Sequence, residues 1–326
     1  MVALFVLAPF VGVRFDASIN DMLVRFGMNG VMVLAMVPMI QAGCGLNFGL
    51  PLGVIAGLLG AITSVEWNMT GLAGVLTAMG VAIPLAVVFG WLYGLLLNKV
   101  KGSEMMIATY VGFSSVALMC IMWLVLPYHS PDMVWGYAGK GLRTTISVER
   151  FWQHAIGSIG KIQINQFFTL YTGMFLFFFL LCAVMYIFLR TRTGTAMTTV
   201  GSNMEYARAS GVNIDRMRTL SVILSTVLGA MGIIVYEQSF GFIQLYMGPF
   251  YMAFPAVAAI LIGGASVKKA TITNVIVGTL LFQGILTMTP SVINSMIQTD
   301  MSEVIRIIVS NGMILYALTR ATKVRS

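Results

Sequence analysis

The sequence predicts an all-α fold, a polytopic transmembrane helical bundle of about ten spans, and two observations carry this prediction. Of the 326 residues, 58% are hydrophobic and 9% are charged, and the mean hydropathy is +0.91. A soluble domain carries roughly 25% charged residues, so the charges here are too few to cover a water-soluble globule. Apolar runs of about 20 residues, the length that crosses a hydrocarbon core of roughly 30 Å, also recur along the chain.

One transmembrane domain is expected over residues 1–326, with short polar connections between most of its spans. The first span, 1–13, is a shortened apolar run ahead of Arg14. A cleaved signal peptide would instead begin with positive charge. The spans are expected at 1–13, 25–43, 47–65, 72–97, 105–127, 167–189, 220–242, 252–264, 272–293 and 303–319.

Lysine and arginine residues predict which connections face the cytoplasm, because short loops that carry them resist translocation. Most of the 19 fall in one alternating set of connections, which includes the segment 190–219 and the C-terminal end. Both termini and 190–219 are therefore expected in the cytoplasm, and the long loop 128–166 is expected to be extracytoplasmic. The net charge of +8 comes from these topology signals, so no nucleic-acid partner is expected.

The segment from Gln41 to Pro51 interrupts an otherwise apolar stretch. Glycine and proline disfavour a regular helix, and helix breaks are expected at Gly43, Gly45, Gly49 and Pro51. Broken backbone at membrane depth is tolerated only where protein or a water-filled cavity satisfies the freed groups. The segment is thus a candidate wall of a solute pathway, and close helix packing through small residues is the alternative.

A second interruption lies in the other half of the chain, where breaks are expected at Pro255, Gly263 and Gly264. Paired breaks in two halves are the best sequence pointer to a transport site. Polar side chains inside spans are costly to bury and are therefore candidates for lining the pathway. The candidates are Gln41, Asn47, Glu237 and Gln283. Glu237 lies near an outer span end, where contact with water is the simpler explanation.

Cysteine and histidine residues predict no metal or catalytic site. Cys44, Cys120 and Cys182 each lie alone in apolar sequence, which is typical of buried structural thiols. His129 and His154 lie apart in the outer loop. They have no nearby cluster of carboxylates for metal binding or acid–base chemistry.

A short helix is expected within the segment 190–219. Asn203 is a favourable N-cap, Glu205 lies in the first turn where the helix dipole favours an anion, and Gly211 suits a left-handed stop. Such a short helix is marginal alone and must be held by packing. We expect it to lie across the membrane surface and present one face to a cytoplasmic partner; a simple connecting helix is the alternative.

The residues of this helix, Glu-Tyr-Ala-Arg-Ala-Ser-Gly from Glu205 to Gly211, resemble the E-A-A-x-x-x-G coupling loop of ABC importer permeases. Tyr206 replaces the first alanine. The stretch 194–218 is similar to this loop in ribose-type permeases, a family of sugar and nucleoside permeases related to branched-chain amino acid permeases, and 258–266 and 277–280 are similar to their eighth and ninth spans. The resemblance implies docking into a groove of an ATPase by Asn203, Glu205, Ala207, Arg208 and Gly211.

Departures from the family pattern bear on the solute. Sugar permeases carry G-I-D-L-S-V-G where this chain has Gly-Cys-Gly-Leu-Asn-Phe-Gly at 43–49, and Y-E-L-D-A-I-A-A where it has 252–259. Gly45, Ala253 and Pro255 thus stand at acidic positions. The resemblance implies a small polar solute, a simple sugar or a nucleoside, and the stretch 102–109 leans toward the nucleoside. Alternatively, a different permease subunit retains the missing acidic residues.

The resemblance also implies an assembly in the bacterial inner membrane, surrounded by lipid. Its other members would be a cytoplasmic ABC ATPase holding ATP and Mg²⁺, a second permease subunit, alike or different, and an extracytoplasmic substrate-binding protein. The chain itself has no G-x-x-x-x-G-K-[ST] phosphate loop, so it is expected to be no enzyme and to hold no cofactor. Two other classes stay open, an ion-coupled secondary transporter working without an ATPase and an intramembrane enzyme, which would need a convergent catalytic set.

Overall fold

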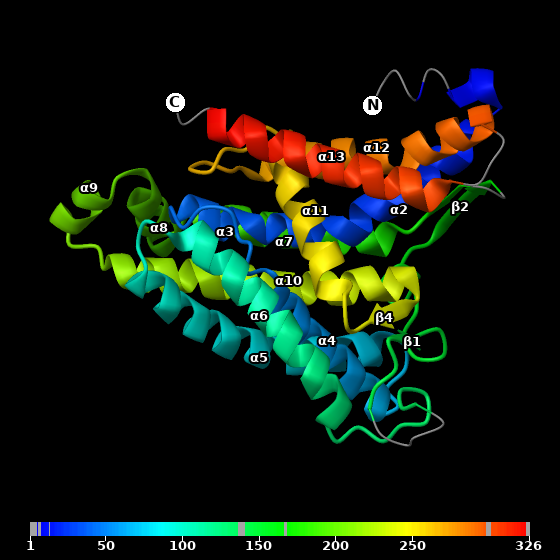
Figure 1. Cartoon of the computed structure of the whole chain (residues 1–326), viewed down its shortest axis with the longest axis horizontal. Coiled ribbons are helices and arrows are strands. Elements are labelled where there is room, and N and C mark those ends of the chain that lie inside the picture. Colours follow the sequence, from blue (N-terminus) through cyan, green and yellow to red (C-terminus); the bar gives the residue numbers. More distant parts are fainter. Residues whose placement is uncertain are drawn as a thin grey trace.

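Long helices run roughly along one axis in the computed structural model, which describes residues 5, 8–12, 14–135, 141–165, 168–297 and 301–323 (Figure 1). The elements in chain order are η1 (Ala8–Val11), α2 (Phe15–Leu34), α3 (Met36–Gln41), α4 (Pro51–Glu66), α5 (Gly71–Lys99), α6 (Glu104–Val125), β1 (Thr145–Ser147), β2 (Ile162–Asn165), β3 (Phe168–Leu170), α7 (Thr172–Arg190), α8 (Arg192–Ser202), α9 (Met204–Ala209), α10 (Ile214–Phe240), β4 (Phe242–Gln244), α11 (Gly248–Ile262), α12 (Ile272–Ile297) and α13 (Ser302–Lys323).

Six helical segments of the described chain are long and apolar enough to cross a membrane. They are Asp16–Gln41, Gly71–Lys99, Glu104–Val125, Thr172–Arg190, Ile214–Phe240 and Ile272–Ser295. Two shorter apolar helices are α4 and α11. The predicted multi-pass helical membrane protein is thereby confirmed. The count of ten and the cytoplasmic position of both termini stay predictions, and the expected span 1–13 falls largely outside the described residues.

Two helices begin earlier than the apolar runs predicted. The helix expected from residue 25 begins at Phe15, and the one expected from residue 220 begins at Ile214. Polar residues in the extra turns are compatible with helix: Asp16 lies in the first turn of α2, and the Asn213 side chain caps α10 by accepting the Arg216 N–H at 3.0 Å. Hydropathy alone missed these turns because their polar side chains belong to helix ends.

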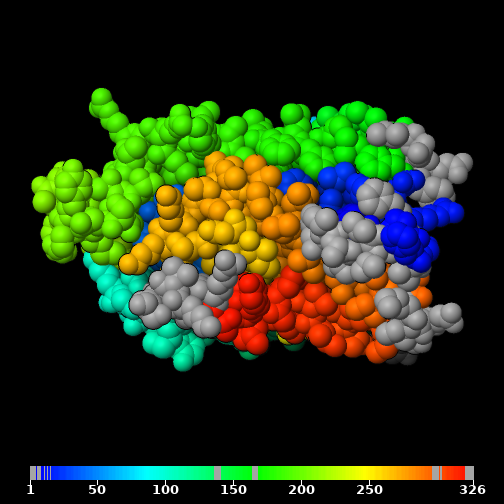
Figure 2. All heavy atoms as spheres, turned by 90° about the horizontal axis from the view of Figure 1, so that it is seen from above, coloured from blue at the N-terminus to red at the C-terminus, as the bar shows by residue number. Residues whose placement is uncertain are grey.

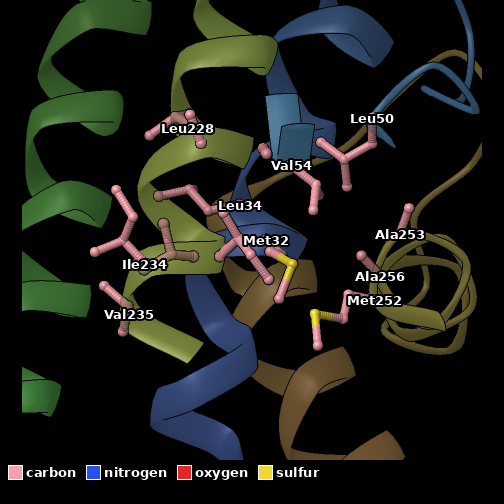
Figure 3. Close-up of a cluster of buried hydrophobic side chains, with 14 of the residues drawn as sticks. Met32, Leu34, Leu50, Val54, Leu228, Ile234, Val235, Met252, Ala253 and Ala256 are labelled. Atoms are coloured by element: carbon pink, nitrogen blue, oxygen red, sulfur yellow. The ribbon is translucent and has the colours of Figure 1, made fainter. Parts of the chain in front are cut away.

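The core lies where α2, α4, α10 and α11 meet. Figure 3 shows Met32 and Leu34 of α2 near Ile234 of α10, with Val54 and Met252 closing the same cluster. Glycines let these helices approach closely: a Cβ atom added to Gly57 of α4 would lie 2.1 Å from the Ile233 side chain of α10. Small residues at helix contacts are the usual means of tight packing inside a membrane.

The described part of the long loop 128–166 is folded, and it adds short strands to a fold that the sequence predicted as all-α. β1 of the loop pairs antiparallel with β4, which follows α10, and β2 pairs antiparallel with β3. The loop also packs onto helix ends, because Gly71 donates its N–H to the Phe151 carbonyl at 2.7 Å. These strands lie at the end of the bundle opposite α8 and α9 (Figure 1). The segments 190–219 and 128–166 therefore mark opposite ends.

His154 of this loop has a strained and partly buried position. Its φ is +53°, its ring stacks on Tyr171 with centroids 5.1 Å apart, and the Lys161 ammonium lies 5.8 Å from the same Tyr171 ring. Burial first, and the charge of Lys161 second, lower the pKa of His154. The folded loop therefore resists a proton that the unfolded chain accepts near pH 6.5.

The loop is expected to lose stability as the pH falls below about 6.5, because the unfolded state then binds more protons than the folded state. Replacing His154 with asparagine, which tolerates the left-handed backbone, should flatten this dependence. Thermal unfolding of the purified protein at pH 5 and pH 7.5 measures it. His129→Asn, in an exposed part of the same loop, is the control and should keep the wild-type difference; an unchanged pH difference in His154→Asn would contradict the prediction.

Candidate functional site at the α9 end of the bundle

The helix α9 has the caps that the sequence predicts. The Asn203 side chain accepts the Tyr206 N–H at 3.0 Å, and Gly211 adopts a left-handed φ of +76°. Arg208 donates to Glu205 at 3.1 Å on the exposed side of the helix. Figure 2 shows this part of the chain, yellow-green at one end, projecting beyond the helices around it.

Only one side of α9 is buried. Ala207 is fully buried and packs with Val200 of α8 and Ile214 of α10 in a small cluster separate from the main core. Tyr206, at 64% exposed, points away from the bundle side. The helix is therefore held by packing on its inner side, as a helix of six residues requires, and its outer side carries Glu205, Tyr206 and Arg208.

The helix α8, which the sequence did not predict, joins α9 to the broken span. A Cβ atom added to Gly43 would lie 2.9 Å from the Gly201 Cα atom, and one added to Gly201 would lie 2.1 Å from the Gln41 carbonyl oxygen. The backbones of α8 and of the break are therefore in direct contact, and either glycine can be replaced only if they separate. The Thr191 side chain, which accepts the Gly194 N–H at 3.2 Å, was the available N-cap signal for α8.

The break itself runs from Ala42 to Leu50 between α3 and α4. Gly43 and Gly45 have left-handed φ values of +74° and +79°, and Pro51 stands in the first turn of α4. Proline suits that position, because its missing N–H would have no partner there. A Cβ atom on Gly49 would lie 2.5 Å from the Tyr93 ring of α5. Glycine is thus required at positions 43 and 45 for the left-handed backbone, and at position 49 for the close approach of Tyr93.

Asn47 lies at the centre of a buried hydrogen-bond network. Its amide nitrogen donates to Ser225 Oγ at 2.7 Å, its oxygen accepts the Tyr93 hydroxyl at 3.4 Å, and Ser225 Oγ donates to the Ala35 carbonyl at 2.5 Å. Ala35 is the joint between α2 and α3. In this conformation Asn47 is 1% exposed and ties the break to α5 and α10; lining of a pathway by Asn47 stays a prediction.

Two ion pairs connect the start of α10 to the turn between α5 and α6 and to the first residue of α6. Lys101 Nζ lies 2.6 Å from Asp215, with both side chains about half exposed. Arg218 donates to Glu104 at 2.6 Å and is itself only 1% exposed. In the sequence Arg218 is one of the basic residues of 190–219 that predict topology. The partner is 114 residues away, so no local pattern could reveal the pair.

A cavity of about 440 Å³ lies between these elements. One wall is the break at Gly43, Cys44 and Gly45, another is the stretch 102–106, and the third is formed by Val267 and Lys268. The connection at 263–271 is held to the break, because the Gln41 side chain donates to the Ala270 carbonyl. The break in the first half of the chain therefore shares one cavity with the connection that follows Gly263 and Gly264 in the second half.

The other predicted polar residues lie elsewhere. Glu237 is fully buried, so the expected contact with water is wrong. The folded loop covers this end of α10, where the Gln238 carbonyl accepts the His154 N–H at 2.7 Å. Neither carboxylate oxygen of Glu237 has a hydrogen-bond partner among the described residues. Gln283 is buried in α12, and within the described chain these two side chains share no hydrogen bond with Gln41 or Asn47.

Only part of the second interruption is a break. Gly263 and Gly264 follow the end of α11, Gly264 has a φ of +90°, and Asn274 donates to the Gly263 carbonyl at 2.7 Å. The helix α11 runs through Pro255, so the expected break there is wrong. Proline removes one N–H donor, and the rest of the helix still forms its bonds around that position.

All the residues of the candidate site lie in the part of the chain that one protein-family model matches. A family model described as branched-chain amino acid transport system / permease component matches residues 18–317. No curated protein and no solved structure matches the chain. Across the described residues no group of three or more histidine, cysteine, aspartate or glutamate side chains is placed to hold a metal ion.

Proposed function

The chain belongs to the family of branched-chain amino acid transport system permease components, and on that premise we propose that it is the translocation subunit of an ATP-driven importer, coupled to a separate ATPase through α9. The observation that carries the proposal is the construction of α9. It is a capped helix, buried on one side and exposed on the other, at the end of the bundle opposite the strand-bearing loop.

The rest of the proposed assembly follows from this role. A cytoplasmic ABC ATPase, which holds ATP and Mg²⁺, would receive the exposed side of α9 with Glu205, Tyr206 and Arg208. A second permease subunit, alike or different, would enclose the pathway in the bacterial inner membrane. An extracytoplasmic substrate-binding protein would meet the strand-bearing loop at the other end. The solute would be small and polar, a simple sugar or a nucleoside.

Two contacts are positioned to carry motion from α9 to the cavity. On one side α8 touches the break through Gly201 and Gly43. On the other, α10 begins five residues after α9 and reaches Glu104 at the cavity wall through Arg218. A tilt of α9 driven by the ATPase would therefore shift two walls of the cavity at once. Packed interfaces switch between discrete arrangements rather than deforming continuously, which suits alternating access.

The test exploits the open surroundings of Gly211. A Cβ atom there would meet nothing within 4 Å, so a substitution acts on the backbone alone. Gly211→Val is expected to reduce ATPase binding and ATP-driven uptake roughly five- to thirtyfold, because a β-branched residue resists the left-handed conformation by roughly 1–2 kcal/mol. Gly211→Asn should be close to wild type, since asparagine tolerates that conformation.

Binding of the ATPase to the purified permease and uptake into proteoliposomes are the two measurements. Glu205→Lys, which reverses the charge at the N-terminal turn of α9, should weaken ATPase binding, and Arg192→Gln on exposed α8 surface should not. Full ATPase binding and uptake by both Gly211→Val and Glu205→Lys, in correctly inserted protein, would remove the coupling role from α9.

A further inference from the structure

The last helix, α13, lies along the outside of the bundle (Figure 1). Its 22 residues make a helix of about 33 Å, close to the roughly 30 Å of a hydrocarbon core. It packs on α11 and on α12, and α12 is one of the six segments apolar enough to cross a membrane. Ala317, which is 3% exposed, anchors α13 in the main core. The helix α13 is therefore placed at membrane depth beside α12.

The side of α13 that faces away from this core is largely exposed. Val304, Ile308 and Leu315 are 48%, 64% and 65% exposed, and Asn311 between them is exposed as well. Their spacing of four, three and four residues places them on one side of a helix. A Cβ atom added to Gly312, next to Asn311, would meet nothing within 4 Å. We call these five residues the Asn311 face.

Asn311 makes this face unsuited to lipid. It is the tenth residue of α13, about 14 Å from the start of the helix and about 18 Å from its end. Its side-chain amide carries two N–H donors and a carbonyl acceptor, and no described residue of the chain bonds to them. Lipid tails offer no partner, and asparagine is too short to reach the headgroups as a lysine or arginine side chain can. The amide therefore needs a partner from outside this chain.

The composition of the Asn311 face favours a second copy of this chain as that partner. In a two-fold dimer the same patch meets itself, so it must be complementary to itself. An amide can donate to and accept from an identical amide, and none of the five residues is charged. The nearby Glu303 and Arg306 pair with each other within the chain at 3.1 Å. Gly312 leaves a notch for a large side chain of the copy, as is usual where membrane helices approach closely.

We propose that the Asn311 face is the surface through which two copies of this chain pair in the membrane, with the two Asn311 amides hydrogen-bonded to each other across the two-fold axis. The proposal makes the second permease subunit a copy of this chain, and it rests on the proposed importer function for the role of the pair. Pairing itself needs neither the ATPase nor a solute. It is therefore measured on the permease alone.

The experiment measures self-association of the purified full chain in lipid vesicles, by energy transfer between labelled copies as added lipid dilutes them. Asn311→Leu removes the amide and should weaken pairing roughly three- to tenfold, the effect of losing one or two hydrogen bonds between membrane helices. Gly312→Leu should weaken it more than about fivefold, because the new side chain fills the notch. Gly80→Leu, at an equally open position of α5, is the matched control and should pair like the wild type.

Cysteine cross-linking locates the surface. Leu315→Cys should give a disulfide-linked dimer on mild oxidation, because pairing brings the two Asn311 faces together. Leu180→Cys, on α7 and 57% exposed, is the matched control and should stay unlinked. The wild type should also stay unlinked, since its own cysteines are buried or partly buried.

The outcomes separate this surface from the function on which it rests. A wild-type chain that stays single, or Leu315→Cys that links only to a different permease in cell membranes, would overturn the proposal and leave the importer intact. Pairing that neither Asn311→Leu nor Gly312→Leu weakens would do the same. So would an Asn311→Leu variant with lower ATP-driven uptake and unchanged pairing, the result expected if Asn311 lined the pathway. A chain that pairs as described but binds no ATPase would end the importer proposal and leave the paired surface.

Discussion

Gly57→Ala is expected to destabilise the bundle by about 1–3 kcal/mol, the usual cost of forcing extra volume into a packed core. The added methyl group would lie 2.1 Å from the Ile233 side chain and 2.6 Å from the Ala230 carbonyl oxygen. Ile233 can change rotamer, but the carbonyl belongs to the backbone of α10 and can retreat only if the whole helix moves. The short helix α4 would then lose its close packing against α10.

Gly80→Ala provides the matched control for this prediction. Gly80 is also helical, in α5, but a Cβ atom there would meet nothing within 4 Å. The same substitution should therefore be neutral or stabilising by up to about 1 kcal/mol, because alanine is the better helix former. Thermal unfolding of both variants in one detergent measures the difference. Equal unfolding midpoints for the two would show that α4 and α10 are not packed as tightly as described.

Local signals were enough to predict the long apolar helices and α9. Apolar runs long enough to cross a bilayer identify helices whatever their packing partners are, and α9 is bounded by Asn203 and Gly211, whose preferences act within a few residues. Helix ends were less predictable, since α2 and α10 extend into polar residues. The break at 42–50 was predictable because glycine and proline act on the backbone itself.

Features that depend on distant pairing were not predictable. The strands β1 and β4 pair across about 95 residues of chain, with Ile146 opposite Ile243, and three-residue strands carry no alternation of their own to reveal them. The face of a helix on which Glu237 lies is also undetermined by hydropathy, because the folded loop that buries it is distant in sequence. Long-range contacts decide burial, and a single sequence does not show them.

The cavity shows how both kinds of information combine. Its glycine wall at Gly43 and Gly45 was predicted as a break, and the 263–264 turn was predicted independently. That the connection after this turn reaches the same cavity, through Val267 and Lys268, follows only from the fold, in which the Gln41 side chain donates a hydrogen bond to the Ala270 carbonyl. The charged member Glu104 was overlooked, because at the start of an apolar run it resembles an ordinary helix N-terminal residue.

Glu104→Gln is expected to destabilise the protein by about 3–5 kcal/mol, the usual cost of breaking a buried ion pair by removing one charge. Arg218 is 1% exposed and always charged, and its Nε and Nη1 atoms have no hydrogen-bond partner among the described residues. Without the Glu104 carboxylate its charge would stay buried and uncompensated. Arg218→Met should cost less, because Glu104 is 14% exposed at the cavity and can reach water.

The double variant Arg218→Met with Glu104→Gln should recover much of the stability lost in Glu104→Gln, since it leaves no buried charge. Lys101→Gln is the matched control: the Lys101–Asp215 pair has the same 2.6 Å separation and also holds the start of α10, through the turn just before α6, but its side chains are 43% and 58% exposed. An exposed pair of this kind contributes less than about 1 kcal/mol. Unfolding midpoints of the wild type, Glu104→Gln, Arg218→Met and the double variant form a double-mutant cycle. Equal losses of stability in Lys101→Gln and Glu104→Gln would contradict the argument from burial.

The Arg218–Glu104 pair should also matter for coupling. It joins the first turns of α10, the helix that follows α9, to the cavity wall. In proteoliposomes the double variant, which is expected to fold, should still hydrolyse ATP but move several-fold less solute for each ATP than the wild type. A structural role alone would lower both quantities together through loss of folded protein. An unchanged ratio of solute to ATP in the double variant would mean that α9 drives the cavity through the Gly201–Gly43 contact instead.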